Sequence, residues 1–221
     1  MKAEIILALD VDSFSKAKYF VRKLYPEIKI FKVGMQLYTS VGPKAIKMIH
    51  ENGGEVFLDL KFLDIPNTVA KAVREAMRHR VKMLTLHISG GEEMLKAAVS
   101  AAKDEAKRLK IKKPLLVGVT VLTSQKSTLA RVLKLARIGI NSGLDGVVCS
   151  ALEAKSLRSK IKSRFVIVTP GIRPAGVDKN DQKRVTTVSE AIKAGSNLLV
   201  IGRPILEALD PLKVAKSLKV N

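Results

Sequence analysis

Eight short apolar runs alternate with amphipathic helical patterns along the 221 residues of the chain, and this alternation predicts an α/β fold. The runs are rich in β-branched residues and almost continuously apolar, which is typical of parallel strands buried on both faces. Eight strand–helix units fit a compact (β/α)8 TIM barrel, although ~250 residues is its more usual size. No linker or change of composition divides residues 1–221, so we expect a single domain.

The strand predictions come from the apolar runs themselves. These runs cover 4–9, 28–33, 55–60, 83–88, 114–120, 145–150, 165–169 and 197–202. A doubly wound open sheet is the alternative arrangement of the same elements. However, the first run leads into the residues DVDSFS and not into a glycine-rich phosphate turn, so the dinucleotide-binding fingerprint is absent.

The helix predictions come from apolar residues that recur every three or four positions between the runs. Such patterns cover 15–24, 43–51, 66–79, 91–109, 128–141 and, less regularly, 151–161. Thr187 and Glu190 have the spacing of a capping box in front of a further helix. Pro204 begins the last helical stretch, which we expect Pro211 to divide in two.

The composition is that of an ordinary globular protein, since 47% of the residues are hydrophobic and 27% are charged. No apolar run approaches the ~20 residues of a membrane span. The apolar run 5–9 is too short for the core of a signal peptide, so we expect a cytoplasmic protein. The single cysteine, Cys149, excludes an internal disulfide and a cysteine-rich metal site, and with only three histidines we do not expect zinc chemistry.

The charge balance is strongly basic, with 40 Lys and Arg residues against 20 Asp and Glu residues and a formal net charge of +20. Such an excess favours anionic partners, either phosphate metabolites or nucleic acid. The basic residues are spread over the helical patterns, and only 4% of the residues are aromatic, which leaves little for base stacking. We therefore interpret most of the charge as solvated surface and do not expect nucleic acid to be the main partner.

The densest polar cluster is LDLKFLDIPNTV, at the end of the third run. Asp59 and Lys61 are two residues apart, so in a strand both side chains point to the barrel interior. Lys32 ends the neighbouring run, and Asp64 needs only a turn to reach the same pocket. Two ammonium groups alternating with two carboxylates would hold a lysine protonated and aimed, as a proton donor requires. The alternative is that these ion pairs only fill the end of the barrel.

A second cluster, VIGRPI, follows the last run. The backbone at Gly202 and Arg203 can approach an anion closely, and barrels commonly bind phosphate here, although a loop glycine before a helix is the simpler interpretation. The long segment 170–186 has no periodic pattern, and we expect it to be a loop that closes over phosphate. Arg173 and Gln182 in this loop are candidate phosphate ligands, or else solvated polar residues.

Other polar residues at the strand ends have two interpretations each. Asp10 could bond sugar hydroxyls or cap the helix that follows it. Thr123 and Ser124 could contact a base or cap the next helix.

With these residues in place, the sequence resembles the orotidine 5′-phosphate decarboxylase family. The matching segments are LALDVDS (7–13), FKVGMQLY (31–38), VFLDLKFLDIPNTV (56–69), GVTVLTS (118–124), TPGIRP (169–174), DQKRV (181–185) and VIGRPI (200–205). They occur in the family's order and span nearly the whole chain. The D-x-K-x-x-D-I-P-N-T block is the most specific of them.

The resemblance implies decarboxylation of orotidine 5′-phosphate to UMP, the last step of de novo pyrimidine synthesis, with no cofactor or metal. Lys61 would protonate the pyrimidine carbon that loses CO2, and Asp59 would lie against the substrate carboxylate. Lys32 and Asp59 would hold the charges in place and contact the ribose. Asp64 would enter from a partner subunit, which implies a homodimer.

The same resemblance assigns the remaining contacts with the nucleotide. Asp10 and Thr68 would contact the ribose side. Thr123 and Ser124 would lie near the pyrimidine. The 5′-phosphate would be bound by Arg173, Gln182, Gly202 and Arg203.

Two other functions compete with this one. Related sugar-phosphate enzymes of the same superfamily share the D-x-K-x-x-D block but use Mg²⁺, with an acidic residue where this chain has Lys32, and a lysine opposes metal binding by charge repulsion. A nucleic-acid-binding protein would explain the charge of +20 but would leave Asp59, Lys61 and Asp64 unexplained.

Overall fold

The computed structural model describes residues 3–122, 125–173 and 186–218, and over them the chain forms a closed barrel of eight parallel strands. Each strand pairs with the next, and the last pairs with the first, where Glu4 lies opposite Leu198. The strands are β1 (Glu4–Ala8), β2 (Ile30–Gly34), β3 (Glu55–Phe62), β4 (Met83–His87), β5 (Leu115–Val119), β6 (Gly146–Val148), β7 (Val166–Thr169) and β8 (Leu198–Ile201). The predicted (β/α)8 barrel is confirmed, and the open sheet is excluded.

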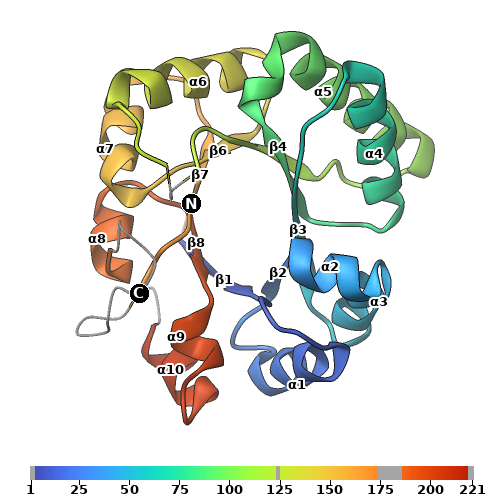
Figure 1. The fold of residues 1–221 in the computed structure, drawn as a ribbon, viewed down its shortest axis with the longest axis vertical. Helices are drawn as coiled ribbons and strands as arrows, with labels where there is room; N and C mark the ends of the chain where they lie inside the picture. The colour runs from blue at the N-terminus through green and yellow to red at the C-terminus, as the bar shows by residue number, and fades with distance from the viewer. Residues whose placement is uncertain (1–2, 123–124, 174–185, 219–221) are drawn as a thin grey trace.

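Helices surround the strands on all sides, as Figure 1 shows in a view along the barrel. They are α1 (Phe14–Leu24), α2 (Met35–Val41), α3 (Lys44–Glu51), α4 (Pro66–Arg78), α5 (Gly91–Leu109), α6 (Leu129–Asn141), α7 (Ala151–Lys160), α8 (Val188–Lys193), α9 (Arg203–Leu206) and α10 (Pro211–Ser217), with a 3-10 turn η1 (Ile88–Gly90). None of the helices in the described ranges combines the length and the apolar character that a membrane crossing needs.

Helix ends follow the capping residues that the sequence supplies. The Ser13 hydroxyl accepts a hydrogen bond from the Lys16 amide at the start of α1. Thr187 and Glu190 form the predicted capping box of α8. The last helical stretch is divided as expected, since α9 ends at Leu206 and α10 begins at Pro211.

Two elements were not predicted, α2 and η1. Helix α2 has only seven residues and follows β2 without a connecting loop, so it offers too few positions for a helical period to be recognised. Of its residues only Leu37 is buried.

The barrel has two cores, because successive residues of a strand point to opposite faces. The outer core lies between the sheet and the helices. The inner core fills the barrel and consists of Ile6, Ala8, Ile30, Phe57, Met83, Val117, Val166, Val168, Leu198 and Val200. Toward the carboxyl ends of β2, β3 and β4 the same inward positions become polar, with Lys32, Asp59 and Thr85. The apolar interior therefore forms the floor of a polar pocket.

Candidate active site

A cavity of ≈ 540 Å³ opens at the carboxyl ends of the strands, where barrel enzymes carry their active sites. Its charged side is formed by Asp10, Lys32, Asp59 and Lys61 from the first three strands and their ends. Its apolar side includes Val119, Val121, Leu122, Val148, Val168 and Ile172. The pocket thus pairs a charged wall with a wall suited to a flat, uncharged ring.

Four charges alternate along one wall of this cavity. Lys32 Nζ lies 2.9 Å from Asp10 Oδ1 and 3.6 Å from Asp59 Oδ2. Lys61 Nζ lies 3.0 Å from the same Asp59 oxygen. We call Asp10, Lys32, Asp59 and Lys61 the in-chain array. Its charges sum to zero, which makes their burial tolerable although Lys32 and Asp59 keep only 11% and 13% of their side-chain surface exposed.

Lys61 reaches the array by a different route from the one predicted. Simple alternation along an extended strand predicts that Asp59 and Lys61 point the same way. In the structure Lys61 has φ 53°, the left-handed region that side chains other than glycine rarely adopt, at a cost of about 1–3 kcal/mol. The pairing of β3 with β4 shifts there, between Leu58 and Phe62. A bulge therefore aims the ammonium group at Asp59, and such strain in a barrel is typical of functional positions.

A residue that sequence reasoning missed, Thr85 on β4, supports this bulge. Its hydroxyl donates to Asp59 Oδ1 at 3.0 Å and accepts from the Lys61 amide at 2.9 Å. The only sequence feature that could have identified Thr85 was its position, two residues before His87 on a strand whose alternate residues face inward. The pKa of His87 is lowered, first by its burial and then by the positive charge of Lys61.

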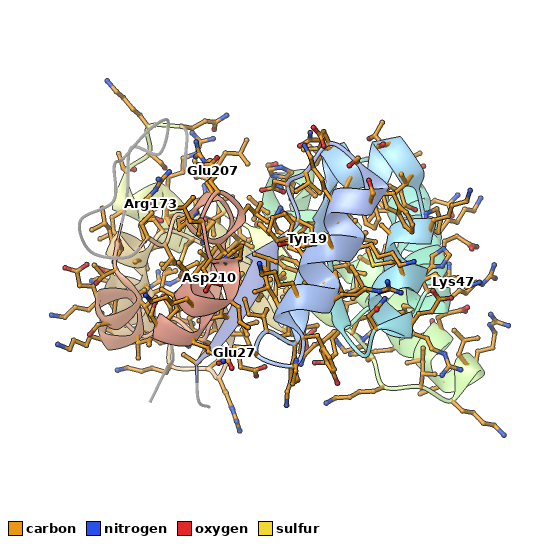
Figure 2. The ribbon with its side chains drawn as sticks, turned by 90° about the horizontal axis from the view of Figure 1, so that it is seen from below. Tyr19, Glu27, Lys47, Arg173, Glu207 and Asp210 are labelled. Carbon is orange, nitrogen blue, oxygen red and sulfur yellow. The ribbon has the colours of Figure 1, made fainter. Side chains whose placement is uncertain are left out.

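The cavity is also lined by Gly202, Arg203 and Pro204 after β8 and by residues 170–173 after β7. A Cβ atom at Gly202 would lie 3.4 Å from Ala8 Cβ and 3.9 Å from Asp10 Oδ2, so it would face the pocket. Arg173 is 3% exposed, and its amide donates to the Thr186 carbonyl. Figure 2 shows Arg173 and Glu207 toward one edge of the barrel and Glu27 at the opposite edge. Two arginines and a glycine thus line one cavity, and these are residue types that bind phosphate groups.

A second cavity of ≈ 590 Å³ lies at the amino-terminal end of the barrel, near the starts of β5, β7 and β8. Arg158 is one of its charged residues, and its guanidinium group donates to the carbonyls of Phe165 and Gly195 and to Asn197 Oδ1. These bonds tie α7 to the loops before β7 and β8, which is a structural role. The charged cavity at the carboxyl ends is therefore the candidate active site, although it is slightly smaller.

Comparison with known proteins assigns the chain to a family. The model of the orotidine 5′-phosphate decarboxylase / HUMPS family matches residues 3–218. The chain belongs to this family. It is 44% identical over 229 residues to orotidine 5′-phosphate decarboxylase of Moorella thermoacetica, with 98% of this chain and 91% of the relative covered. It is 48% identical to the protein of the same name from Vibrio atlanticus, with 96% and 94% covered.

A solved structure supports the same assignment. The crystal structure of orotidine 5′-phosphate decarboxylase from Lactobacillus acidophilus matches this barrel with a TM-score of 0.85 and 34% sequence identity, and 98% of this chain and 97% of that chain are covered. These matches confirm the resemblance predicted from the D-x-K-x-x-D-I-P-N-T block. As a member of the decarboxylase family, the protein is a carboxy-lyase.

The decarboxylase chain does not bring Asp64 into its own pocket. Asp64 is exposed, its Oδ1 accepts the Ile65 amide at 2.6 Å, and it is not among the residues that line the cavity. The turn after β3 does not carry Asp64 into the array of its own chain, where Asp10 is the second carboxylate beside Lys32. Thr68, in the first turn of α4, is exposed and also outside the lining. The contribution of Asp64 across a subunit interface and the contact of Thr68 with the ribose remain predictions.

Three predicted site residues of this decarboxylase fall outside the described residues, namely Thr123, Ser124 and Gln182. The described part of the expected phosphate-closing loop is limited to residues 170–173 and 186. Within the described ranges, no group of three or more His, Cys, Asp and Glu residues is arranged to hold a metal ion.

Proposed function

We propose that the protein catalyses the cofactor-independent decarboxylation of orotidine 5′-phosphate to UMP, the last step of de novo pyrimidine synthesis, in the cytoplasm. Relatives at 44–48% identity carry the name of this activity. The observation that carries the proposal is the in-chain array, in which the Lys61 ammonium group lies 3.0 Å from Asp59 at the wall of a nucleotide-sized pocket. An array of this kind suits a reaction that leaves an electron pair on carbon.

In the proposed reaction the bond between the pyrimidine ring and its carboxylate breaks, and CO2 leaves. The electron pair stays on the ring carbon, where no electron sink is available, so its stabilisation must be electrostatic and preorganised. The fixed ammonium group of Lys61 supplies that stabilisation and then transfers a proton to the same carbon. Lys61, left neutral, regains its proton from solvent.

Asp59 has two parts in this proposal. Its carboxylate keeps the ammonium groups of Lys32 and Lys61 charged and in place before substrate binds, because it contacts both. It would also lie against the substrate carboxylate, and this repulsion is relieved as the carboxylate becomes neutral CO2 and its negative charge moves to the ring carbon beside Lys61. Interactions of this kind, which improve as the transition state is approached, are those that raise kcat.

The 5′-phosphate would occupy the part of the cavity lined by the residues after β7 and β8. Support comes from the two arginines there, Arg173 and Arg203, and from the pocket-facing Gly202. Gln182 would join them from the loop that closes over the substrate. The ribose would lie between the phosphate and the array, within reach of Asp10, Lys32, Asp59 and Thr68, and the pyrimidine near Thr123 and Ser124.

A homodimer is part of the proposal, with Asp64 completing the site of the other subunit. Leu63 and Ile65, which flank Asp64, keep 53% and 66% of their surface exposed, and Met35 keeps 57%. Large exposed apolar side chains next to an exposed carboxylate, as at Leu63 and Ile65, are the pattern expected of a surface that a second copy covers. Sedimentation of the purified protein tests this point, and a monomer at micromolar concentration would contradict it.

The direct test mixes the purified protein with orotidine 5′-phosphate in EDTA and follows the ultraviolet change that accompanies formation of UMP. We expect turnover to be unaffected by the chelator. A Mg²⁺-dependent sugar-phosphate enzyme, the other branch of the family that the name HUMPS denotes, would show no such turnover and would require added metal for its own reaction. Absence of decarboxylation in a folded, dimeric sample would overturn the proposed function.

A further inference from the structure

We infer that Thr85 is a positioning residue for the decarboxylation, holding Lys61 and Asp59 in their reactive arrangement through a single hydroxyl group. This inference rests on the proposed function. Thr85 does not line the cavity and therefore does not act on substrate directly. It acts through the two residues that it bonds.

The first support is the register of the sheet. Leu58 lies opposite Leu84, and the next pair along the two strands is Phe62 opposite Leu86. Three residues of β3, Asp59, Leu60 and Lys61, therefore stand across from the single residue Thr85. A bulge of this size leaves backbone groups without ladder partners. The amide of Lys61 is one of them, and Thr85 Oγ1 accepts its hydrogen bond at 2.9 Å.

The second support is the direction of the hydrogen bonds. An amide can only donate and an ionised carboxylate can only accept, so the hydroxyl must accept from Lys61 and donate to Asp59. The Thr85 oxygen does both, at 2.9 Å and 3.0 Å, while the residue is only 1% exposed. The same oxygen thus fixes the left-handed backbone that carries the proton donor and the orientation of the carboxylate beside it.

The third support is the residue type. Threonine is branched at Cβ, so its side chain has few rotamers in a strand, and its hydroxyl direction is set by the backbone. Valine has nearly the same shape without the oxygen, and serine has the oxygen without the methyl group. These two substitutions separate the hydrogen bonds of Thr85 from its volume.

A matched control exists in the same barrel. Thr169, at the end of β7, is fully buried, and its hydroxyl bonds the Ser196 hydroxyl at 2.7 Å. Neither residue contacts the in-chain array. Thr169→Val therefore removes a buried strand hydroxyl and leaves a polar group without its partner, as Thr85→Val does, but away from Lys61.

The experiment measures kcat, KM, UMP affinity and Tm for Thr85→Val, Thr85→Ser, Thr85→Ala and Thr169→Val. We expect Thr85→Val to lower kcat by roughly 10- to 100-fold, the scale of a misplacement of about 1 Å at a reacting group, and to leave UMP affinity within about threefold. We expect Thr85→Ser to restore kcat to within about threefold of the unmodified enzyme. Thr169→Val should lower Tm by about as much as Thr85→Val does, with little effect on kcat.

Two results would overturn the inference. The first is a kcat of Thr85→Val equal to that of Thr169→Val, because the hydroxyl would then matter only for stability. The second is a folded Thr85→Ser variant as slow as Thr85→Ala, and this comparison decides the question even if valine prevents folding. Failure of the unmodified protein to decarboxylate orotidine 5′-phosphate would instead remove the proposed function.

Discussion

Lys61 Nζ lies 3.0 Å from Asp59 Oδ2. The backbone of Lys61 is left-handed and lies in a bulge of β3, so it does not follow the geometry of an ordinary strand. The ion pair is thus the product of a strained local structure rather than of simple alternation. Because that strain is stabilised by burial and by Thr85, the ammonium group is held in place before substrate arrives.

The first prediction concerns Lys61→Ala. We expect kcat to fall by at least the ~10²–10⁴-fold that general acids contribute, because both the cation and the proton donor are lost. Binding of UMP should largely persist, since the phosphate end of the pocket is untouched. Lys96→Ala is the control, because Lys96 is an exposed helical lysine that pairs only with Glu92 among the described residues. Near-normal turnover in Lys61→Ala would exclude Lys61 as the proton donor.

The second prediction concerns Arg203→Ala at the phosphate end. Loss of a charge-assisted hydrogen bond of about 1.5–3 kcal/mol should weaken UMP binding by roughly 10- to 100-fold. Uridine, which has no phosphate, should bind the variant and the unmodified protein equally. Calorimetric titration with both ligands measures the difference. If the variant loses uridine and UMP affinity to the same extent, Arg203 does not act through the phosphate.

The third prediction concerns Gly34, which ends β2 beside the array. A Cβ atom at this position would lie 3.0 Å from Lys32 Nζ and 3.3 Å from Asp10 Oδ1. Gly34→Ala must therefore displace the Lys32–Asp10 pair, and we expect kcat/KM to fall by roughly tenfold or more.

Gly42→Ala serves as the contrast for that substitution. Gly42 has φ 60° with nothing within 4 Å of the added atom, so alanine there should lower Tm through backbone strain and leave kcat/KM unchanged. Equal kcat/KM for both variants would show that the space around Lys32 does not matter for the reaction.

How far the sequence predicts this site can be judged from individual residues. The strand ends were found because buried parallel strands are nearly continuous apolar runs, and Lys32, Asp59 and Lys61 stand out where those runs stop. The bulge was not found, because no local signal in DLKFL requires φ 53° at Lys61. Asp10 and Asp64 could not be ranked as partners of Lys32, since that depends on distances between separate strands. Thr85 was missed because threonine is an ordinary strand residue.

The fourth prediction concerns acid stability and the buried Glu105 of α5. Its carboxylate accepts hydrogen bonds from Arg108 at 2.5 Å and 2.9 Å and from Arg78 of α4 at 3.5 Å. The Arg108 bond, above all, lowers the pKa of Glu105 from 4.5 to about 2. Because this pKa is lower in the folded state than in the unfolded state, the ionised Glu105 carboxylate stabilises the fold. This stabilisation is fully present above pH 4.5 and is lost as the pH falls toward 2.

We therefore expect Glu105→Gln to unfold more readily than the unmodified protein at pH 7, and the difference to shrink as the pH falls from 4.5 toward 2. Urea unfolding at a series of pH values measures it. Glu92→Gln, which removes an exposed partner of Lys96, is the control and should change little. A stability difference that is constant over this range would contradict the assigned cause.

The fifth prediction follows from the net charge of +20 of a protein proposed to bind an anion that carries both a phosphate and a carboxylate. A field of this sign raises the rate of encounter with anions, and salt screens it, since the Debye length falls from about 30 Å at 0.01 M to about 8 Å at 0.15 M. We expect kcat/KM for orotidine 5′-phosphate to fall by roughly tenfold over that range of NaCl, while kcat at saturating substrate stays constant. Stopped-flow binding of UMP should show the same loss in its association rate, and uridine should show none. If kcat/KM is flat across the salt range, the basic surface does not steer the substrate, and its excess charge has another cause.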